Sequence, residues 1–194
     1  MEKGRILLLN GPSSAGKTTL AWELQTNAPN YWYWLPLDHF FDTVPSQLWE
    51  KDEDESFRIA FDFHHDCIKL ASDQGKDVIV DTVFCCRDTF ASFERKLAGY
   101  PVIMVKVTCP VEELNRRELA RGDRDVGIAA GEADIIVPQK SYDLIVDTHA
   151  QSTEECARCI MELLANPQKP PTAFAKLATN PNRWINAAHQ SEML

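Results

Sequence analysis

The segment from Gly11 to Thr18 constrains the fold of this chain more than any other stretch. It reads GPSSAGKT, follows the short apolar run RILLLN and precedes the helix-forming run TLAWELQ. The spacing G-x-x-x-x-G-K-[S/T] between a strand and a helix is the pattern of a P-loop, in which successive backbone N–H groups converge on an anion. The two glycines allow the tight turn, and the helix that follows directs the positive end of its dipole at the same point.

Two side chains in this loop supply the charge and the metal ligand that a nucleoside triphosphate needs. Lys17 adds a full positive charge at the β- and γ-phosphates, and Thr18 offers its hydroxyl to Mg²⁺. The segment therefore predicts a binding site for ATP with Mg²⁺. The residues expected to hold the nucleotide in this loop are Gly11, Ser13, Ser14, Ala15, Gly16, Lys17, Thr18 and Thr19.

Apolar strand-like runs alternate with helical patterns along the chain. Strands are expected at residues 5–9, 31–37, 77–81, 101–108 and 143–147, and helices at 17–26, 56–74, 87–98, 111–121 and 153–165. The strand-like runs are short and nearly continuous in hydrophobicity, which is typical of strands buried on both faces. The alternation predicts an α/β fold of the three-layer α/β/α P-loop NTPase type, with a central five-stranded parallel sheet.

Two segments interrupt this alternation. Residues 40–55 are long, acidic and turn-prone, so we interpret them as an insertion that covers the substrate. Residues 167–194 are rich in proline and asparagine, and we expect a C-terminal tail there that packs late or not at all. The chain has 194 residues, of which 44% are hydrophobic, enough for one packed domain. We place this kinase-like domain at residues 1–166.

Charge and hydropathy exclude some classes of partner. The formal net charge is -9, which disfavours binding to nucleic acids and to anionic membranes. No apolar run approaches the roughly 18 residues of a membrane span, so we expect a cytoplasmic protein that binds a small molecule. The C-x-x-C pair of Cys156 and Cys159 falls within a helical pattern, and we interpret both as reduced thiols near the core.

Carboxylates follow the second and third predicted strands. Asp38 falls at the carboxyl end of the second strand, where ligands bind in open α/β sheets, and could accept a proton from a substrate hydroxyl. Asp81 closes the third strand and matches the place of an acid that holds Mg²⁺. Each could instead cap a turn or a helix. We expect Phe41, Asp42 and Phe84 to contact the substrate with Asp38.

Arginines cluster in the segment NRRELARGDRDVG. Arg117 and Arg121 lie four residues apart on one predicted helix face, and Arg124 follows in a loop that we interpret as a short lid over residues 121–128. Arginines that close over phosphates supply the charge that phosphoryl transfer needs. The alternative is a solvated face on which the arginines pair with nearby acids, among them Glu113 and Glu118, and we favour this alternative for Arg116.

Four motifs together resemble the chloramphenicol phosphotransferase family. They are LNGPSSAGKTTLA, LDHFFDTVP, RGDRDVGIAAGEA and YDLIVDT, and the resemblance extends from about residue 5 to about residue 164. It implies a small ATP-dependent kinase that phosphorylates a hydroxyl of chloramphenicol, with Asp38 as base, Lys17 and Arg124 as further catalytic residues, and a role in antibiotic resistance. Similarity to nucleotide sites of the adenylate-kinase type further implies that Arg117 lies against the adenine and Arg121 near the phosphates, with Thr148 and His149 bordering the base.

We therefore expect a phosphotransferase that moves the γ-phosphate of MgATP to a hydroxyl of a small molecule. One alternative is a kinase for another metabolite, such as a nucleotide, a sugar acid or a shikimate-like compound. A nucleotide acceptor would need arginines near Asp38, and the residues that follow it up to Glu55 include none. An alternative of another class is a binding or switch module gated by ATP, without transfer activity, which would not need Asp38.

Overall fold

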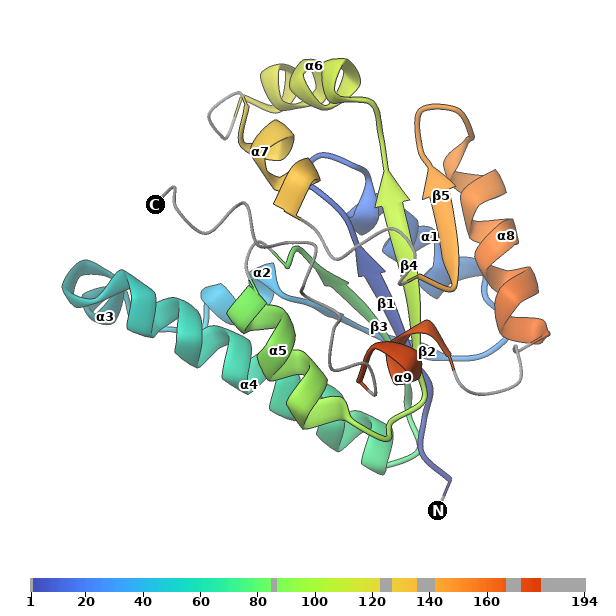
Figure 1. Cartoon of the computed structure of the whole chain (residues 1–194), viewed down its shortest axis with the longest axis horizontal. Helices are drawn as coiled ribbons and strands as arrows, with labels where there is room; N and C mark the ends of the chain where they lie inside the picture. Colours follow the sequence, from blue (N-terminus) through green and yellow to red (C-terminus); the bar gives the residue numbers. More distant parts are fainter. Residues whose placement is uncertain (1, 85–86, 123–126, 136–141, 167–171, 179–194) are drawn as a thin grey trace.

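Five parallel strands form the centre of the protein in the order β2-β3-β1-β4-β5 (Figure 1). The computed structural model describes residues 2–84, 87–122, 127–135, 142–166 and 172–178. The strands are β1 (Ile6–Asn10), β2 (Trp32–Pro36), β3 (Asp77–Thr82), β4 (Val102–Thr108) and β5 (Leu144–Asp147). Each predicted strand is present, with its ends shifted by one residue at most.

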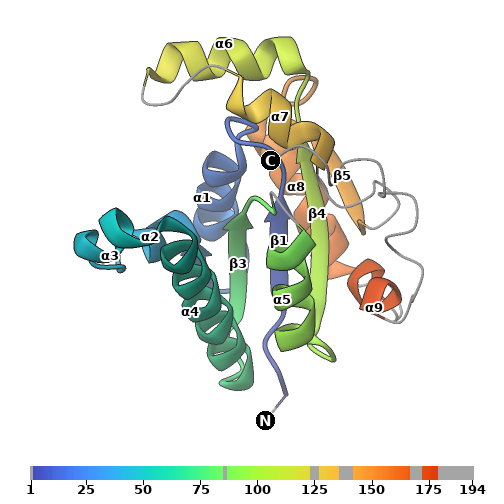
Figure 2. The ribbon, with the colours of Figure 1, turned by 60° about the vertical axis from the view of Figure 1, so that its left-hand side comes forward.

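Helices cover both faces of this sheet. They are α1 (Lys17–Asn27), α2 (Asp38–Phe41), α3 (Ser46–Lys51), α4 (Glu53–Asp73), α5 (Arg87–Leu97), α6 (Val111–Arg121), α7 (Ile128–Ile135), α8 (Thr153–Ala165) and α9 (Ala173–Ala178). Helices α1 and α8 cover one face, α4, α5 and α9 cover the other, and α6 and α7 lie beyond the carboxyl ends of the strands (Figures 1 and 2). The predicted three-layer α/β/α fold is confirmed.

The alternation of side chains along β1 divides the hydrophobic core in two. Leu7 and Leu9 belong to the cluster on the side of α1 and α8, whereas Ile6 and Leu8 belong to the cluster on the side of α4, α5 and α9. All four side chains are fully buried, and burial of each contributes roughly 2 kcal/mol. A strand covered on both faces therefore needs apolar residues at every position, which explains the unbroken run in the sequence.

The acidic segment at residues 40–55 is helical rather than turn-prone. It contains α3, and its last residues begin α4. The Asp52 side chain accepts a hydrogen bond from the backbone N–H of Glu55 at 3.0 Å and so caps α4. Acids in a first helical turn are stabilised by the helix dipole, so the charged run is the start of a long helix. Trp49 anchors it edge-on against Phe57, with ring centroids 5.0 Å apart.

The packed part of the chain continues past residue 166. Phe174 of α9 is 1% exposed and packs against Phe93 of α5, with ring centroids 5.7 Å apart. Asp143 fixes α9 to the sheet, because its carboxylate accepts hydrogen bonds from the backbone N–H groups of Ala173 in α9 and Met104 in β4, each at 2.8 Å. Part of the segment expected to be a tail therefore completes the second core cluster.

Within the part of the chain that the structure describes, no helix is long and apolar enough to cross a membrane. The C-x-x-C pair lies within α8, where Cys156 is buried in the first core cluster and Cys159 is half-buried. Burial raises the pKa of the Cys156 thiol, so this sulfur is a protonated core atom at neutral pH.

Candidate functional site

The P-loop has the backbone geometry that its glycines predict. A Cβ on Gly11 would lie 2.1 Å from the carbonyl oxygen of Val107, so only glycine fits where the loop crosses β4. Gly16 has φ of 89° and forms the N-cap of α1 without a capping side-chain hydrogen bond. The first turn of α1 therefore directs its N–H groups and the positive end of the helix dipole at the loop, as expected of a phosphate-binding loop. Lys17 is 7% exposed, and its Nζ donates to the carbonyl oxygen of Pro12 at 2.8 Å.

The sheet register brings Asp81 to the P-loop and to the start of α2. Asp81 on β3 is aligned with Leu9 of β1 and with Pro36 of β2. The backbone N–H of Leu37 donates to the Asp81 carbonyl oxygen at 3.0 Å, which fixes the first residue of α2, Asp38, at the same edge. Asp38 is exposed there. The two predicted carboxylates thus lie at one end of the sheet.

Asp81 and Thr18 place two side-chain oxygen atoms next to each other. The Thr18 hydroxyl donates to Asp81 Oδ2 at 2.7 Å. Burial raises the pKa of the Asp81 carboxyl, the Lys17 charge and the Thr18 hydrogen bond lower it, and the negative charge of Asp38 raises it. A hydroxyl beside a carboxylate is the hard-oxygen donor set that Mg²⁺ prefers, so these residues fit the metal that the P-loop implies.

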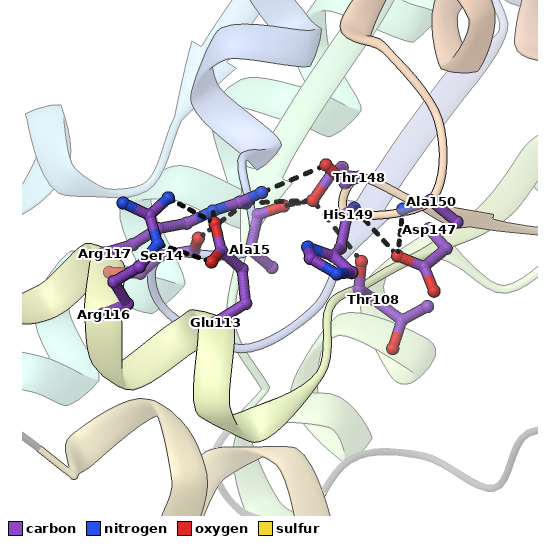
Figure 3. Close-up of polar contacts among 10 residues, drawn as sticks. All are labelled: Ser14, Ala15, Thr108, Glu113, Arg116, Arg117, Asp147, Thr148, His149 and Ala150. Carbon is purple, nitrogen blue, oxygen red and sulfur yellow. Dashed lines mark hydrogen bonds and ion pairs between the residues drawn. The ribbon is translucent and has the colours of Figure 1, made fainter.

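Arg117 connects the P-loop to two other elements (Figure 3). Its Nη1 donates to the carbonyl oxygen of Ser14 at 3.3 Å and to Oγ1 of Thr148 at 3.0 Å, and its Nη2 donates to the Thr148 carbonyl oxygen at 3.0 Å. The Thr148 hydroxyl in turn donates to the carbonyl oxygen of Ala15 at 2.8 Å. The guanidinium is thereby fixed against the loop, with α6 on one side and the turn after β5 on the other.

The neighbouring Arg116 differs from Arg117. Both guanidinium groups bind the carboxylate of Glu113, but the Arg116 side chain is 68% exposed and the Arg117 side chain 25% exposed. Of these two arginines, only Arg117 donates a hydrogen bond to the P-loop in the part of the chain that the structure describes. The structure thus agrees with the solvated alternative for Arg116.

One cleft of about 2030 Å³ joins most of the predicted site. It extends from the P-loop past α2 to the α4 and α5 side of the sheet. The predicted residues that line it are Ser13, Ser14, Gly16, Lys17, Thr18, Thr19, Asp38, Phe41, Asp42, Asp81, Arg117 and Arg121. Gly11 and Ala15 contribute backbone and are buried, and Arg124 lies outside the described residues. The P-loop and the acid after β2 therefore share one space.

Phe84 lies away from this space. Its side chain is 2% exposed and packs edge-on against Phe90 with ring centroids 5.1 Å apart, inside the second core cluster. Its backbone N–H donates to Oδ1 of Asn10 at 3.2 Å, which holds the end of β3 beside β1. The residue predicted to contact the substrate is a core residue here, because the chain after β3 turns its aromatic ring back toward α5.

Five charged residues that the sequence analysis did not single out also line the cleft. They are Asp54, Arg58 and Asp62 of α4, Arg95 of α5 and Glu132 of α7. The residues of α4 and α5 lie outside the four motifs, so no local pattern indicated them. Glu132 falls within the motif RGDRDVGIAAGEA, where nothing in the pattern indicated its place in the cleft.

The Glu118 side chain holds the end of the segment predicted as a lid. This side chain is 1% exposed, and its two carboxylate oxygens accept from the N–H groups of Gly127 and Ala129, each at 2.8 Å. Glu118 therefore caps α7 rather than pairing with an arginine on a solvated face. Arg121, the last residue of α6, is exposed and lines the cleft.

The fold resembles those of solved P-loop kinases. An APS kinase of Mycobacterium tuberculosis, solved with AMPPNP and APS, superposes with a TM-score of 0.66 at 18% identity over 85% of this chain and 99% of that chain. Shikimate kinase from Acinetobacter baumannii, solved with shikimate, superposes with a TM-score of 0.61 at 19% identity over 87% and 97%. The protein therefore has the fold of the P-loop kinases.

Sequence comparison identifies the family. The profile of the chloramphenicol phosphotransferase-like proteins matches residues 4–165. “Putative O-phosphotransferase Rv2636” of Mycobacterium tuberculosis strain ATCC 25618 / H37Rv is 35% identical over 186 residues, which cover 84% of this chain and 83% of that protein. The chain belongs to the chloramphenicol phosphotransferase-like family, as its four motifs predicted.

Proposed function

We propose that the protein is a phosphotransferase that moves the γ-phosphoryl group of ATP to a hydroxyl of a small molecule, chloramphenicol or a compound like it. One observation carries this proposal: Asp38 and the pair of Thr18 and Asp81 line the same cleft as the P-loop. Family membership and the relative described as an O-phosphotransferase support the reaction class.

The proposed reaction uses Asp38 as the base. The acceptor oxygen bonds to the γ-phosphorus, the bond from that phosphorus to the oxygen bridging to ADP breaks, and the hydroxyl proton passes to the Asp38 carboxylate. Asp38 is exposed at the first residue of α2, where its carboxylate can reach a bound hydroxyl. A positioned base of this kind contributes about 10²- to 10⁴-fold to the rate.

Positive groups on the other side of the cleft offset the charge of the phosphates. Lys17 and Arg121 line the cleft, and Arg124 is proposed to act with them. Thr18 and Asp81 would hold Mg²⁺, which neutralises phosphate charge when bound. Positioning and electrostatics supply most of the acceleration in this type of reaction, because the phosphoryl transition state is loose.

The test is direct. The native protein, Asp38→Asn and Glu50→Gln are incubated with MgATP and chloramphenicol, and the products are examined by mass spectrometry. Glu50 is an exposed acid on α3, so its variant controls for the loss of one charge near the site. Phosphorylated chloramphenicol is expected from the native protein and Glu50→Gln, and none from Asp38→Asn. Product from Asp38→Asn at the native rate would refute the role of this carboxylate.

A second candidate function, a kinase for an anionic hydroxyl metabolite, is favoured by Arg58 and Arg95. The stretch after Asp38 has no arginine, but folding brings these two to the same cleft from α4 and α5. Arg58 pairs with Glu55 at 2.6 Å and with Asp62 at 3.1 Å, whereas Arg95 is exposed and has no ion pair with the described residues. A carboxylate or phosphate on the acceptor would give Arg95 a partner.

Mass spectrometry also separates these candidates. If native protein that binds MgATP leaves chloramphenicol unchanged, the same assay is run on matched neutral and anionic hydroxyl compounds. Product only with anionic compounds would favour the second candidate. Binding of MgATP with no transfer to any hydroxyl compound would favour a nucleotide-gated binding module.

A further inference from the structure

Glu132 of α7 contacts the phosphate-binding loop directly. Its Oε2 accepts a hydrogen bond from the backbone N–H of Ser13 at 2.6 Å, and the side chain is half-buried and lines the cleft. Figures 1 and 2 show α7 beside the loop that joins β1 to α1. A carboxylate thus occupies one of the donors of a loop whose purpose is to hold anions.

The position suits a negative charge for the same reasons that it suits a phosphate. The uncapped start of α1 directs its N–H groups and the positive end of its dipole into the cleft, and Lys17 lies in the same loop. A hydrogen bond from a backbone N–H to a carboxylate is shorter and stronger than one between neutral groups. The contact between Ser13 and Glu132 therefore stabilises this arrangement of α7.

Helix α7 is held by two acids that act on different neighbours. Glu118 of α6 binds the N–H groups of Gly127 and Ala129 at its start, and Glu132 binds the P-loop one turn later. The first contact joins α7 to α6, and the second joins it to the nucleotide site. Loss of the second alone would free α7 from the loop while its attachment to α6 remains.

We propose that Glu132 is an internal anion that competes with the phosphates of the nucleotide for the P-loop and thereby sets nucleotide affinity. The proposal rests on nucleotide binding at this loop, part of the proposed function, and does not depend on phosphoryl transfer. The carboxylate and a triphosphate repel each other and seek the same donors, so binding of the triphosphate releases Glu132 and loosens α7 from the loop.

Calorimetric titration with a non-hydrolysable ATP analogue and Mg²⁺ tests the competition. Glu132→Gln keeps the size of the side chain and removes its charge, and Glu112→Gln removes an equal charge from the exposed start of α6. We expect the Kd of Glu132→Gln to fall about tenfold and that of the control to stay unchanged. An unchanged or higher Kd for Glu132→Gln would overturn the proposal, since Glu132 would then have no effect on phosphate binding or would favour it.

Adenosine distinguishes competition from a general change in the site. It has no phosphate, so its affinity should be the same in the native protein and in Glu132→Gln. Equal tightening for adenosine and for the triphosphate analogue would also contradict the proposal. Failure of the native protein to bind the analogue would instead refute the nucleotide site itself, which keeps the two failures apart.

Hydrogen exchange provides a measurement on the native chain that needs no variant. The proposal predicts faster amide exchange in residues 127–135 when the analogue is bound, because α7 has then lost its contact with Ser13. Slower exchange, or no change, in that segment at saturating analogue would mean that Glu132 keeps its hydrogen bond to Ser13, and would contradict the proposal.

Discussion

The proposed nucleotide side and the proposed acceptor side of the cleft are built in different ways. On the nucleotide side, hydrogen bonds join the P-loop and the start of α1 to β3, α6, α7 and the turn after β5. They run through Asp81, Arg117, Glu132 and Thr148 respectively. On the acceptor side, α2, α3 and α4 meet mainly through aromatic rings, such as Phe41 against Phe57 at 5.3 Å between centroids. The first arrangement has little freedom of geometry, and the second can be changed by side-chain substitution alone.

This difference suggests that one side of the cleft serves phosphoryl transfer and the other side serves the choice of acceptor. Phosphate geometry is the same for every acceptor, so the side that holds it can be fixed by backbone and buried polar groups. The acceptor differs from kinase to kinase, and residues such as Arg58 and Arg95 lie on helix faces whose backbone does not depend on them. We therefore expect substitutions on the nucleotide side to change the rate with any acceptor, and substitutions on the other side to change preference.

The largest effect is expected for Lys17→Ala. The variant removes the positive charge of the loop, so we expect kcat/KM to fall about 10³-fold with every acceptor and nucleotide affinity to fall as well. Steady-state kinetics and calorimetry with MgATP measure the two. Lys51→Ala, an exposed lysine on α3, is the control. Turnover retained in Lys17→Ala would contradict the central role of the loop.

Arg117→Ala should weaken nucleotide binding about 10- to 100-fold, because it removes charged hydrogen bonds to Ser14 and Thr148. Arg116→Ala is a matched control, since both arginines bind Glu113 and only Arg117 contacts the loop. Calorimetry on the two variants makes the comparison. Equal losses would show that the shared contact with Glu113 is what matters.

Acid should destabilise the acceptor side through His64 and His65 of α4. Both are 1% exposed, and burial lowers the pKa of His64 to about 4 and that of His65 to about 3, so both are neutral when folded. The unfolded chain binds protons near pH 6.5, so stability is full above that pH and falls as the pH drops toward 4. From pH 7.5 to pH 5 the loss should be about 2 kcal/mol for each histidine.

Urea unfolding at the two pH values measures this loss. His65→Phe keeps a ring against Phe93 and cannot titrate. The difference in the free energy of unfolding between pH 7.5 and pH 5 should therefore be about 2 kcal/mol smaller in this variant than in the native protein. His39→Gln, which replaces an exposed histidine at the start of α2, serves as the control. An unchanged dependence in His65→Phe would mean that other groups govern acid stability.

The smallest effect is expected for Arg95→Gln. With an anionic acceptor, we expect KM to rise about fivefold with kcat unchanged, because an exposed ion pair contributes little. With chloramphenicol, which carries no such charge, no change is expected. Arg158→Gln on α8 serves as the control. A change in kcat rather than KM would place Arg95 in the reaction and not in acceptor choice.

The sequence predicted most of the fold because its signals are local. The apolar runs of strands buried on both faces and the spacing of the P-loop need no knowledge of the rest of the chain. The start of α4 was missed although Asp52 and Glu55 have the spacing of a capped helix, since a run of acids also fits a loop. In a segment of this kind, the spacing of an N-cap should decide between a helix and a loop before the run of negative charges does.

The site was predicted in part, for a related reason. Asp38 and Asp81 follow strands, and parallel strands end at one edge, so their common location could be inferred. Arg95 and Glu132 reach the cleft only because α5 and α7 pack where they do, and no motif contains that information. Phe84 shows the opposite error, since a position just after a strand does not decide which way the ring turns.

We propose that the purine base of the nucleotide stacks on Arg117, and the fixed orientation of this side chain then bears on which purine is accepted. Nε, Nη1 and Nη2 of this side chain all donate to acceptors of the protein itself, so what it offers a ring stacked on it is chiefly its flat cationic face. A face of this kind attracts any aromatic base and does not read the groups on its edge, where adenine and guanine differ. Discrimination between ATP and GTP would then depend on contacts other than those of Arg117.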